Sequence, residues 1–202
     1  MFQVQLRSAA RSVPARLAAL SWCAWALVAS PGAAAEAPLA DAAKDRAWDQ
    51  VEALLAEGTA VDQTQGDGAT ALHWAAYWGE ESALQALLKA GATVNAANEY
   101  GATPLWAACA TGQSATVERL LTAGADPNLG LSSGETLLMR CAHTGSTDGV
   151  RELLAQGADI DAAEPERGQT ALMRAVASGH EAVTGLSLIH ISEPTRLGML
   201  SC

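Results

Sequence analysis

Glycines, threonines and paired leucines recur along this chain with a spacing of 33 residues, except that the last glycine and threonine follow after 34. The first series consists of Gly68, Gly101, Gly134 and Gly168, and the threonines two residues later are Thr70, Thr103, Thr136 and Thr170. Leucine pairs precede further glycines at Leu54-Leu55, Leu87-Leu88, Leu120-Leu121 and Leu153-Leu154. A fixed period between 20 and 50 residues is typical of proteins built from stacked structural repeats. The period therefore predicts a repeat architecture.

Each repeated position has a physical role in a pair of helices. A threonine at the start of a helix can accept a hydrogen bond from a free backbone N–H, and Pro104 suits the first helical position. A glycine after a helix takes the left-handed conformation that ends it. Small residues such as Ala75-Ala76 allow neighbouring helices to pack closely. The leucine pairs give the second helix of each repeat its apolar face.

The stretch GATALHWAAYWGEESALQALLKAGATVNAANEY resembles an ankyrin repeat, and the resemblance extends from Leu39 to Thr184. It implies an all-α fold, an ankyrin-repeat solenoid of stacked helix-turn-helix units with protruding hairpin loops. Residues 36–66 lack the opening threonine motif and are expected to form an N-terminal capping repeat. Residues 67–184 contain three full repeats and a fourth that stops inside its second helix. We expect the natural protein to continue beyond this point.

The first 35 residues have the pattern of a secretory signal peptide. Arg7, Arg11 and Arg16 precede an apolar run from Leu17 to Ser30, and Ala33-Ala34-Ala35 provides a cleavage site before Glu36. We expect a secreted or periplasmic protein with no membrane attachment after cleavage. The alternative is a retained membrane anchor, for which the run is short, because a spanning helix needs about 20 residues.

Residues 185–202 depart from the repeat. The segment LSLIHISEPTR resembles the translated end of a sequencing-library adapter, so we expect this tail not to be natural. It should be extended, poorly packed or arbitrarily continued as helix. The alternative is a divergent C-terminal strand.

Charge and motifs argue against several classes of function. Residues 36–184 hold 21 acidic and 8 basic side chains, a net charge of −13, which repels nucleic acid and anionic membranes. We find no nucleophile elbow, phosphate loop or zinc-ligand spacing, and we predict no catalytic residue, metal ligand or cofactor. His73 occupies a repeat position filled elsewhere by Trp106, Met139 and Met173, which favours a structural role.

Cys109 and Cys141 lie one repeat apart on successive first helices. Helix axes about 8–10 Å apart exceed the roughly 4.4–6.8 Å Cα separation of disulfides, so two buried thiols are predicted. A disulfide is the alternative, because an oxidising compartment would permit it.

The predicted partner-binding surface centres on two aromatic residues. In the ankyrin pattern, Tyr77 and Trp78 face the concave side, and aromatic anchors dominate many interfaces. Trp74 and Tyr100 are also predicted members, as is His143, which occupies the position equivalent to Tyr77 in a later repeat. The predicted polar rim consists of Glu99, Glu135, Glu166 and Arg167. The alternative is that Tyr77 and Trp78 pack against the cap.

The resemblance implies a non-enzymatic protein–protein interaction module whose partner is another protein. Two alternatives stay open. One is an immunity-type protein that occludes a basic toxin or enzyme. The other is the N-terminal binding part of a larger enzyme.

Overall fold

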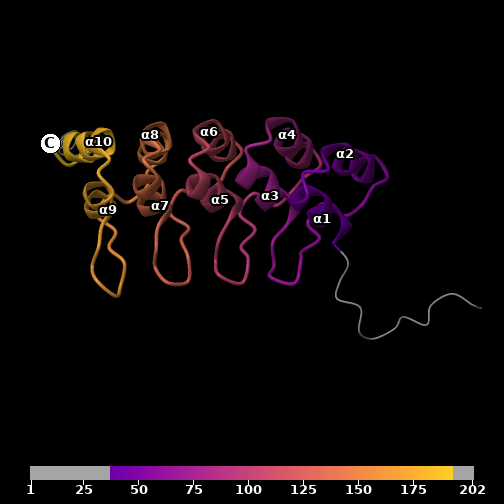
Figure 1. Cartoon of the computed structure of the whole chain (residues 1–202), viewed down its shortest axis with the longest axis horizontal. Helices are drawn as coiled ribbons and strands as arrows, with labels where there is room; N and C mark the ends of the chain where they lie inside the picture. Colours follow the sequence, from indigo (N-terminus) through magenta and orange to yellow (C-terminus); the bar gives the residue numbers. More distant parts are fainter. Residues whose placement is uncertain (1–36, 193–202) are drawn as a thin grey trace, which may run out of the picture. The chain divides into compact units, whose positions relative to one another are not determined.

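The computed structural model describes residues 37–192, the side chains of 187–192 excepted, and this range folds into five consecutive helical hairpins (Figure 1). The helices are α1 (Pro38–Lys44), α2 (Trp48–Ala56), α3 (Ala71–Trp78), α4 (Glu81–Lys89), α5 (Pro104–Thr111), α6 (Ser114–Thr122), α7 (Leu137–Thr144), α8 (Thr147–Ala155), α9 (Ala171–Ala177) and α10 (Glu181–Ser192). Two isolated β-bridges are the only extended pairings among the described residues. The predicted all-α repeat fold is confirmed.

The hairpins stack so that their helices form two rows. Figure 1 shows α1, α3, α5, α7 and α9 beside the long loops, and we call them the inner row. The helices α2, α4, α6, α8 and α10 form the outer row. Each inner helix packs against the next inner helix along the stack. The 33-residue period of the sequence is thus the spacing of one hairpin to the next.

The predicted threonine caps begin the inner helices. The hydroxyls of Thr103, Thr136 and Thr170 each accept a hydrogen bond from the backbone N–H three residues later, at 3.2, 3.2 and 3.4 Å. These bonds satisfy donors that have no partner inside the helix. Gly79 then ends α3 with a φ of 67°, a left-handed conformation that costs glycine nothing.

The core lies between the two rows and consists mainly of alanine and leucine. The largest fully buried side chains are Leu39, Leu72, Leu84, Leu87, Leu105, Leu120, Leu137, Leu138, Met139, Leu153, Val51 and Val117. Asparagines hold successive loops in register, since Asn95 accepts a hydrogen bond from the backbone of Asp126 at 3.0 Å and donates one to Gly124 at 3.3 Å. Asn128 bonds the next loop in the same way.

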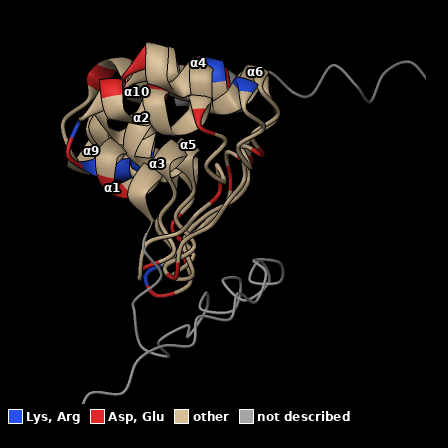
Figure 2. Ribbon diagram, turned by 90° about the vertical axis from the view of Figure 1, so that its right-hand side faces the viewer, with Lys and Arg blue, Asp and Glu red and all other residues tan. Residues whose placement is uncertain are grey.

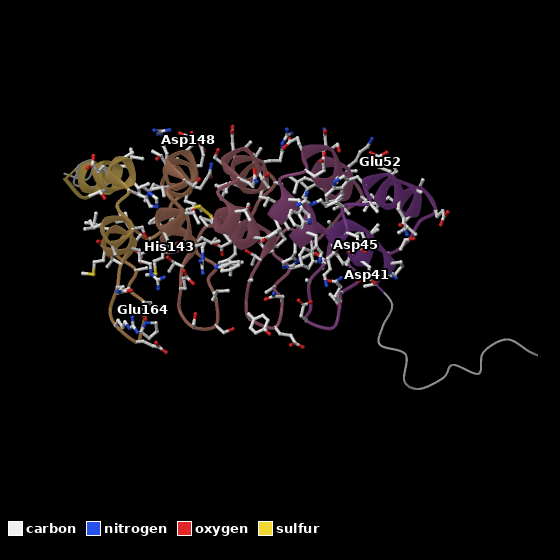
Figure 3. The ribbon with its side chains drawn as sticks, viewed as in Figure 1. Asp41, Asp45, Glu52, His143, Asp148 and Glu164 are labelled. Atoms are coloured by element: carbon white, nitrogen blue, oxygen red, sulfur yellow. A yellow bond between two sulfur atoms is a disulfide. The ribbon has the colours of Figure 1, made fainter. Side chains whose placement is uncertain are left out.

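Cys109 and Cys141 form a disulfide between α5 and α7, so the prediction of two free thiols is wrong. The Cα atoms are 4.7 Å apart, within the range that disulfides prefer. The sequence argument used the distance between helix axes. Because each Cα lies about 2.3 Å from its axis, facing Cα atoms on axes 8–10 Å apart approach to roughly 3.4–5.4 Å. The bond appears in yellow in Figure 3.

The facing of these two cysteines follows from their places in the repeat. Cys109 lies six residues after its capping threonine, whereas Cys141 lies five residues after its own. The pairs Ala76 with Ala108 and Ala142 with Ala175 occupy the same two positions at neighbouring interfaces, and all four alanines are fully buried.

At the C-terminal end, α10 continues as one helix from Glu181 through Leu186 to Ser192. Continuation as helix is one of the outcomes expected for the tail. Residues 1–36, with the predicted signal peptide, and residues 193–202 lie outside the described range. None of the helices in the described range has the length and apolar character needed to cross a membrane.

Candidate partner-binding surface

The partly exposed side of the inner row, which we call the inner face, is formed by residues four, seven and eight places after each capping threonine. In α3 these are Trp74, Tyr77 and Trp78, whereas α5 places Ala107, Ala110 and Thr111 there. In α7 they are Arg140, His143 and Thr144, and in α9 they are Arg174, Ala177 and Ser178. Among these three positions, aromatic side chains occur only in α3, and Trp106 of α5, one position earlier in its helix, is also partly exposed.

The three aromatic rings of α3 contact one another. The Trp74 and Tyr77 ring centres are 6.0 Å apart at an interplanar angle of 73°, and those of Tyr77 and Trp78 are 4.8 Å apart at 85°. Edge-to-face arrangements of this kind are favourable because the positive edge of one ring meets the negative face of another. Tyr77 thus lies between two indoles.

The end of α1 and the following turn hold Trp78 in place. The indole N–H of Trp78 donates to the backbone oxygen of Lys44 at 3.3 Å, and the guanidinium of Arg46 lies 3.6 Å from the centre of its ring. Arg46 has a φ of 60°, the only positive value among the described non-glycine residues. Such a conformation costs free energy and persists only where the surroundings enforce it. Packing against the cap, the alternative weighed for Trp78, therefore accounts for its contacts.

Trp74 is held by a chain of side-chain hydrogen bonds. Its indole N–H donates to Gln65 Oε1 at 2.8 Å, and Gln65 Nε2 donates to Asp41 Oδ1 at 2.5 Å. The ammonium of Lys44 lies 5.5 Å from the centre of the Trp74 ring. Both indole N–H groups are thereby satisfied within the protein.

Tyr77 is the most available member of this aromatic cluster. Tyr77 is 38% exposed, and its hydroxyl has no hydrogen-bond partner among the described residues. A tyrosine hydroxyl can both donate and accept. The ring is therefore fixed on two sides, and its polar end is free to bond another molecule.

The predicted loop residues differ in their exposure. Tyr100 is 66% exposed, and Glu99, Glu166 and Arg167 are also exposed. Hydrogen bonds of the Tyr100 backbone to Asn98 and Ser132 fix its loop. Glu99, Glu166 and Arg167 are exposed, as the predicted polar rim requires, and Tyr100 is exposed next to Glu99.

Glu135 does not lie on an exposed rim, so this part of the prediction is wrong. The residue is only 8% exposed, and its carboxylate forms ion pairs with Arg140 at 2.9 Å and Arg174 at 3.2 Å. A carboxylate is rarely buried unless it is paired. Its partner Arg174 comes from the next repeat, which is why Glu135 could not be placed from its own loop.

The histidines have separate roles. His143 is exposed on α7, as Figure 3 shows, and its Nδ1 lies 2.9 Å from the Ser178 hydroxyl. His73 is buried, accepts the backbone N–H of Thr70 at Nδ1 and lies with Nε2 3.0 Å from the backbone oxygen of Ala102. Burial lowers the pKa of His73, and hydrogen bonding and nearby charge offset this only in part. These contacts place His73 in a structural role.

Glu164, which the sequence did not single out, organises the last long loop at the position marked in Figure 3. Burial acts to raise the pKa of Glu164, but backbone hydrogen bonds from Glu166, Arg167 and Gln169, with the charge of Arg174, lower it overall. Its two oxygens are therefore occupied by the loop that presents Glu166 and Arg167.

Sequence reasoning also missed the cap residues that hold the aromatic cluster, Lys44, Arg46 and Gln65, and the arginines on α7 and α9. The three cap residues precede the first full repeat and act on the indole rings of α3, so no repeat position marks them. The two arginines share one repeat position, but that position does not reveal that they meet on Glu135. The described part of the chain brings together no three His, Cys, Asp or Glu side chains able to hold a metal ion.

The comparisons with known proteins concern the family. The family model for ankyrin repeats (3 copies) matches residues 39–131 and 116–193. No curated protein matches the sequence. The matched residues cover all five hairpins, including the inner face with its aromatic cluster. The chain therefore belongs to the ankyrin-repeat family.

Proposed function

We propose that this protein is an exported, non-enzymatic binding protein whose inner face holds a protein partner at Tyr77. Ankyrin repeats are generally protein–protein interaction modules, and proteins built from them are typically not enzymes. The single observation that carries the proposal is the half-exposed Tyr77 ring, fixed between Trp74 and Trp78 with its hydroxyl unbonded.

The rigidity of this cluster favours binding. A partner that orders a flexible side chain loses part of its affinity to the lost conformational entropy. The cap already orders Trp74 and Trp78 through their N–H groups, and the two indoles restrict Tyr77. Binding then requires little further ordering. Aromatic anchors of this kind, surrounded by contacts that exclude water, contribute a large share of the affinity in many interfaces.

Two independent features support export. The N-terminal 35 residues have the charge, apolar run and small-residue cleavage site of a secretory signal. The Cys109–Cys141 disulfide is fully buried within the stack, and disulfides form and persist mainly in oxidising compartments. A binding protein in the periplasm or outside the cell accounts for both features.

A photo-crosslinking amino acid tests the proposed surface directly. It would replace Tyr77 in one variant and Gln85 in a matched control, because Gln85 is exposed on α4 in the outer row. In exporting cells, we expect the Tyr77 position to capture one defined protein that the Gln85 position does not capture. The captured protein is then purified for affinity measurement with Tyr77→Ala and Gln85→Ala.

Tyr77→Ala should weaken the purified complex at least tenfold, whereas Gln85→Ala should leave its affinity unchanged. Equal capture at both positions, or equal affinity of the two alanine variants, would remove Tyr77 from the proposed interface.

A further inference from the structure

Charge is unevenly distributed between the last four helices of the inner row and the rest of the stack, whereas α1 carries Asp41 and Lys44. Helices α3, α5, α7 and α9 contain no Asp or Glu, although residues 36–184 hold 21. Figure 2 shows acidic residues along the hairpin loops and on helices of the outer row. The charged side chains of these four inner helices are the arginines Arg140 and Arg174. The inner face is therefore uncharged at α3 and α5 and carries two cationic side chains at α7 and α9.

The two arginines meet on one carboxylate. Arg140 Nη2 lies 2.9 Å from Glu135 Oε2, and Arg174 Nη1 lies 3.2 Å from Glu135 Oε1. The arginine side chains are 24% and 25% exposed, whereas that of Glu135 is 10% exposed. The Arg140 guanidinium also lies 4.7 Å from the centre of the Trp106 ring. Glu135 therefore holds both guanidinium groups, Trp106 also contacts that of Arg140, and both groups are partly exposed on the inner face.

These guanidinium groups have more donors than the surrounding residues accept. A guanidinium carries five N–H donors. Among the described residues, each arginine donates to Glu135 alone, and both Nε atoms are buried without an acceptor. The positive charge of Arg174 helps to lower the pKa of Glu164, but the carboxylate oxygens of Glu164 accept hydrogen bonds from the backbone N–H groups of Glu166 and Arg167. Because the Nε atoms are buried, a second carboxylate would bond the remaining N–H groups at the partly exposed ends of the two guanidinium groups.

We propose that Arg140 and Arg174 bind a carboxylate of the partner, so that the occupant of the inner face is a peptide segment bearing an acidic group. The forked N–H groups of a guanidinium match the two oxygens of a carboxylate, and Arg140 and Arg174 already bind the carboxylate of Glu135. The acidic group is an Asp or Glu side chain or a C-terminal carboxylate. This inference rests on the proposed function of the inner face.

The stack also sets the spacing of the bound segment. Arg140 on α7 and Arg174 on α9 are two and three repeats from α3, so a carboxylate between them lies about 20–25 Å away for axes that pack at 8–10 Å. An extended chain advances roughly 3.3 Å per residue. The carboxylate at Arg140 and Arg174 therefore lies about six to eight residues from the group that contacts Tyr77.

Selection from random ten-residue peptides on the purified chain tests the inference. One library joins the peptide's C-terminus to its carrier, and a second leaves the C-terminus free. We expect an apolar or aromatic residue and an acidic group at the stated spacing. Enrichment of Asp or Glu in both libraries identifies a side chain, whereas an acidic preference met only by the free terminus identifies a C-terminal carboxylate.

A synthetic peptide from the selection then measures the contact. Replacing its acidic residue by the amide, or amidating its terminus, should weaken binding to the unaltered chain at least tenfold, since bonds to charged groups are stronger than neutral ones. The same change should have little effect on binding to Arg140→Gln/Arg174→Gln. The control is Arg119→Gln/Arg151→Gln, which changes two exposed arginines of the outer row and should preserve the tenfold effect.

Each outcome decides the matter. An acidic preference that persists in Arg140→Gln/Arg174→Gln, or selected peptides without an acidic group, overturns the inference. If Tyr77→Ala abolishes binding in that case, the proposed function still stands. Failure of the unaltered chain to select any peptide above an unfolded control overturns the inference of a bound peptide segment, whereas the crosslinking test at Tyr77 decides the proposed function separately. Should the glutamine variant unfold, Arg140→Lys/Arg174→Lys replaces it, because this variant keeps the charge but lacks the guanidinium fork. For this variant, the ratio of affinities between the acidic peptide and its amide should fall to half of its original value or less.

Discussion

Removing the Cys109–Cys141 disulfide should destabilise the protein by a magnitude that follows from its position in the chain. The perturbation is Cys109→Ala/Cys141→Ala, which places at this interface the same pair found at the neighbouring ones, Ala76 with Ala108. The cysteines are 32 residues apart. Closing a loop of this length in the unfolded chain contributes about 3–4 kcal/mol to the free energy of unfolding at 25 °C.

Thermal unfolding followed by circular dichroism measures this difference. A domain of this size changes its melting temperature by about 2–4 °C per kcal/mol, so the alanine variant should melt about 6–16 °C lower without reductant. Unaltered protein that is unfolded, reduced and refolded with reductant should lose most of this advantage. The alanine variant is the control for reductant itself and should melt at the same temperature with and without it.

Equal melting temperatures of the two proteins without reductant would refute the entropic argument. A separate peptide map checks the bond, because trypsin should leave residues 90–119 joined to residues 141–151 in unreduced protein. Recovery of these two peptides unlinked would contradict the disulfide.

The remaining predictions concern His73, the signal peptide and the tail. The pKa of His73 is lower in the folded protein than its ordinary value of 6.5. The neutral ring therefore stabilises the fold at pH values above 6.5, and this contribution is lost as the pH falls from 6.5 through the pKa of the folded state. The difference in urea midpoint between unaltered protein and His73→Met should therefore shrink from pH 7.5 to pH 5.0, and a difference independent of pH would contradict the role of the neutral ring. The exported protein should have the intact mass of a chain beginning at Glu36, and a mature form that retains Cys23 would refute the predicted cleavage. Genomic DNA sequenced without transposase-based library chemistry should lack the codons for LSLIHISEPTR, and their recovery would show that the tail is natural.

The sequence predicted those parts of the fold that depend on local, repeated interactions. Thr103 and Thr136 cap helices through residues only three places away, and the paired leucines lie in the core or pack against it. A period read along the chain contains this information. The order of the helices in two rows follows from it.

The parts that could not be predicted depend on contacts between repeats. Glu135 is buried because Arg174, 39 residues later, reaches its carboxylate. The disulfide depends on which side chains of α5 and α7 face each other, which axis spacing alone did not reveal. Trp78 is held by Arg46, whose left-handed backbone has no sequence signal comparable to a glycine. Within the candidate site, Tyr77 and Tyr100 were placed correctly on exposed positions, whereas their supporting residues were not foreseen.

The most direct test of the account compares Tyr77→Ala with Trp78→Ala in both affinity and melting temperature, using the partner captured at Tyr77. Tyr77→Ala should cost on the order of 2 kcal/mol of binding free energy, roughly a thirtyfold loss of affinity, and should lower the melting temperature less than Trp78→Ala does. Trp78→Ala should lower the melting temperature, because it removes the contacts of this ring with Lys44 and Arg46. A large melting loss for Tyr77→Ala with unchanged affinity of the remaining folded protein would contradict the claim that Tyr77 anchors the partner.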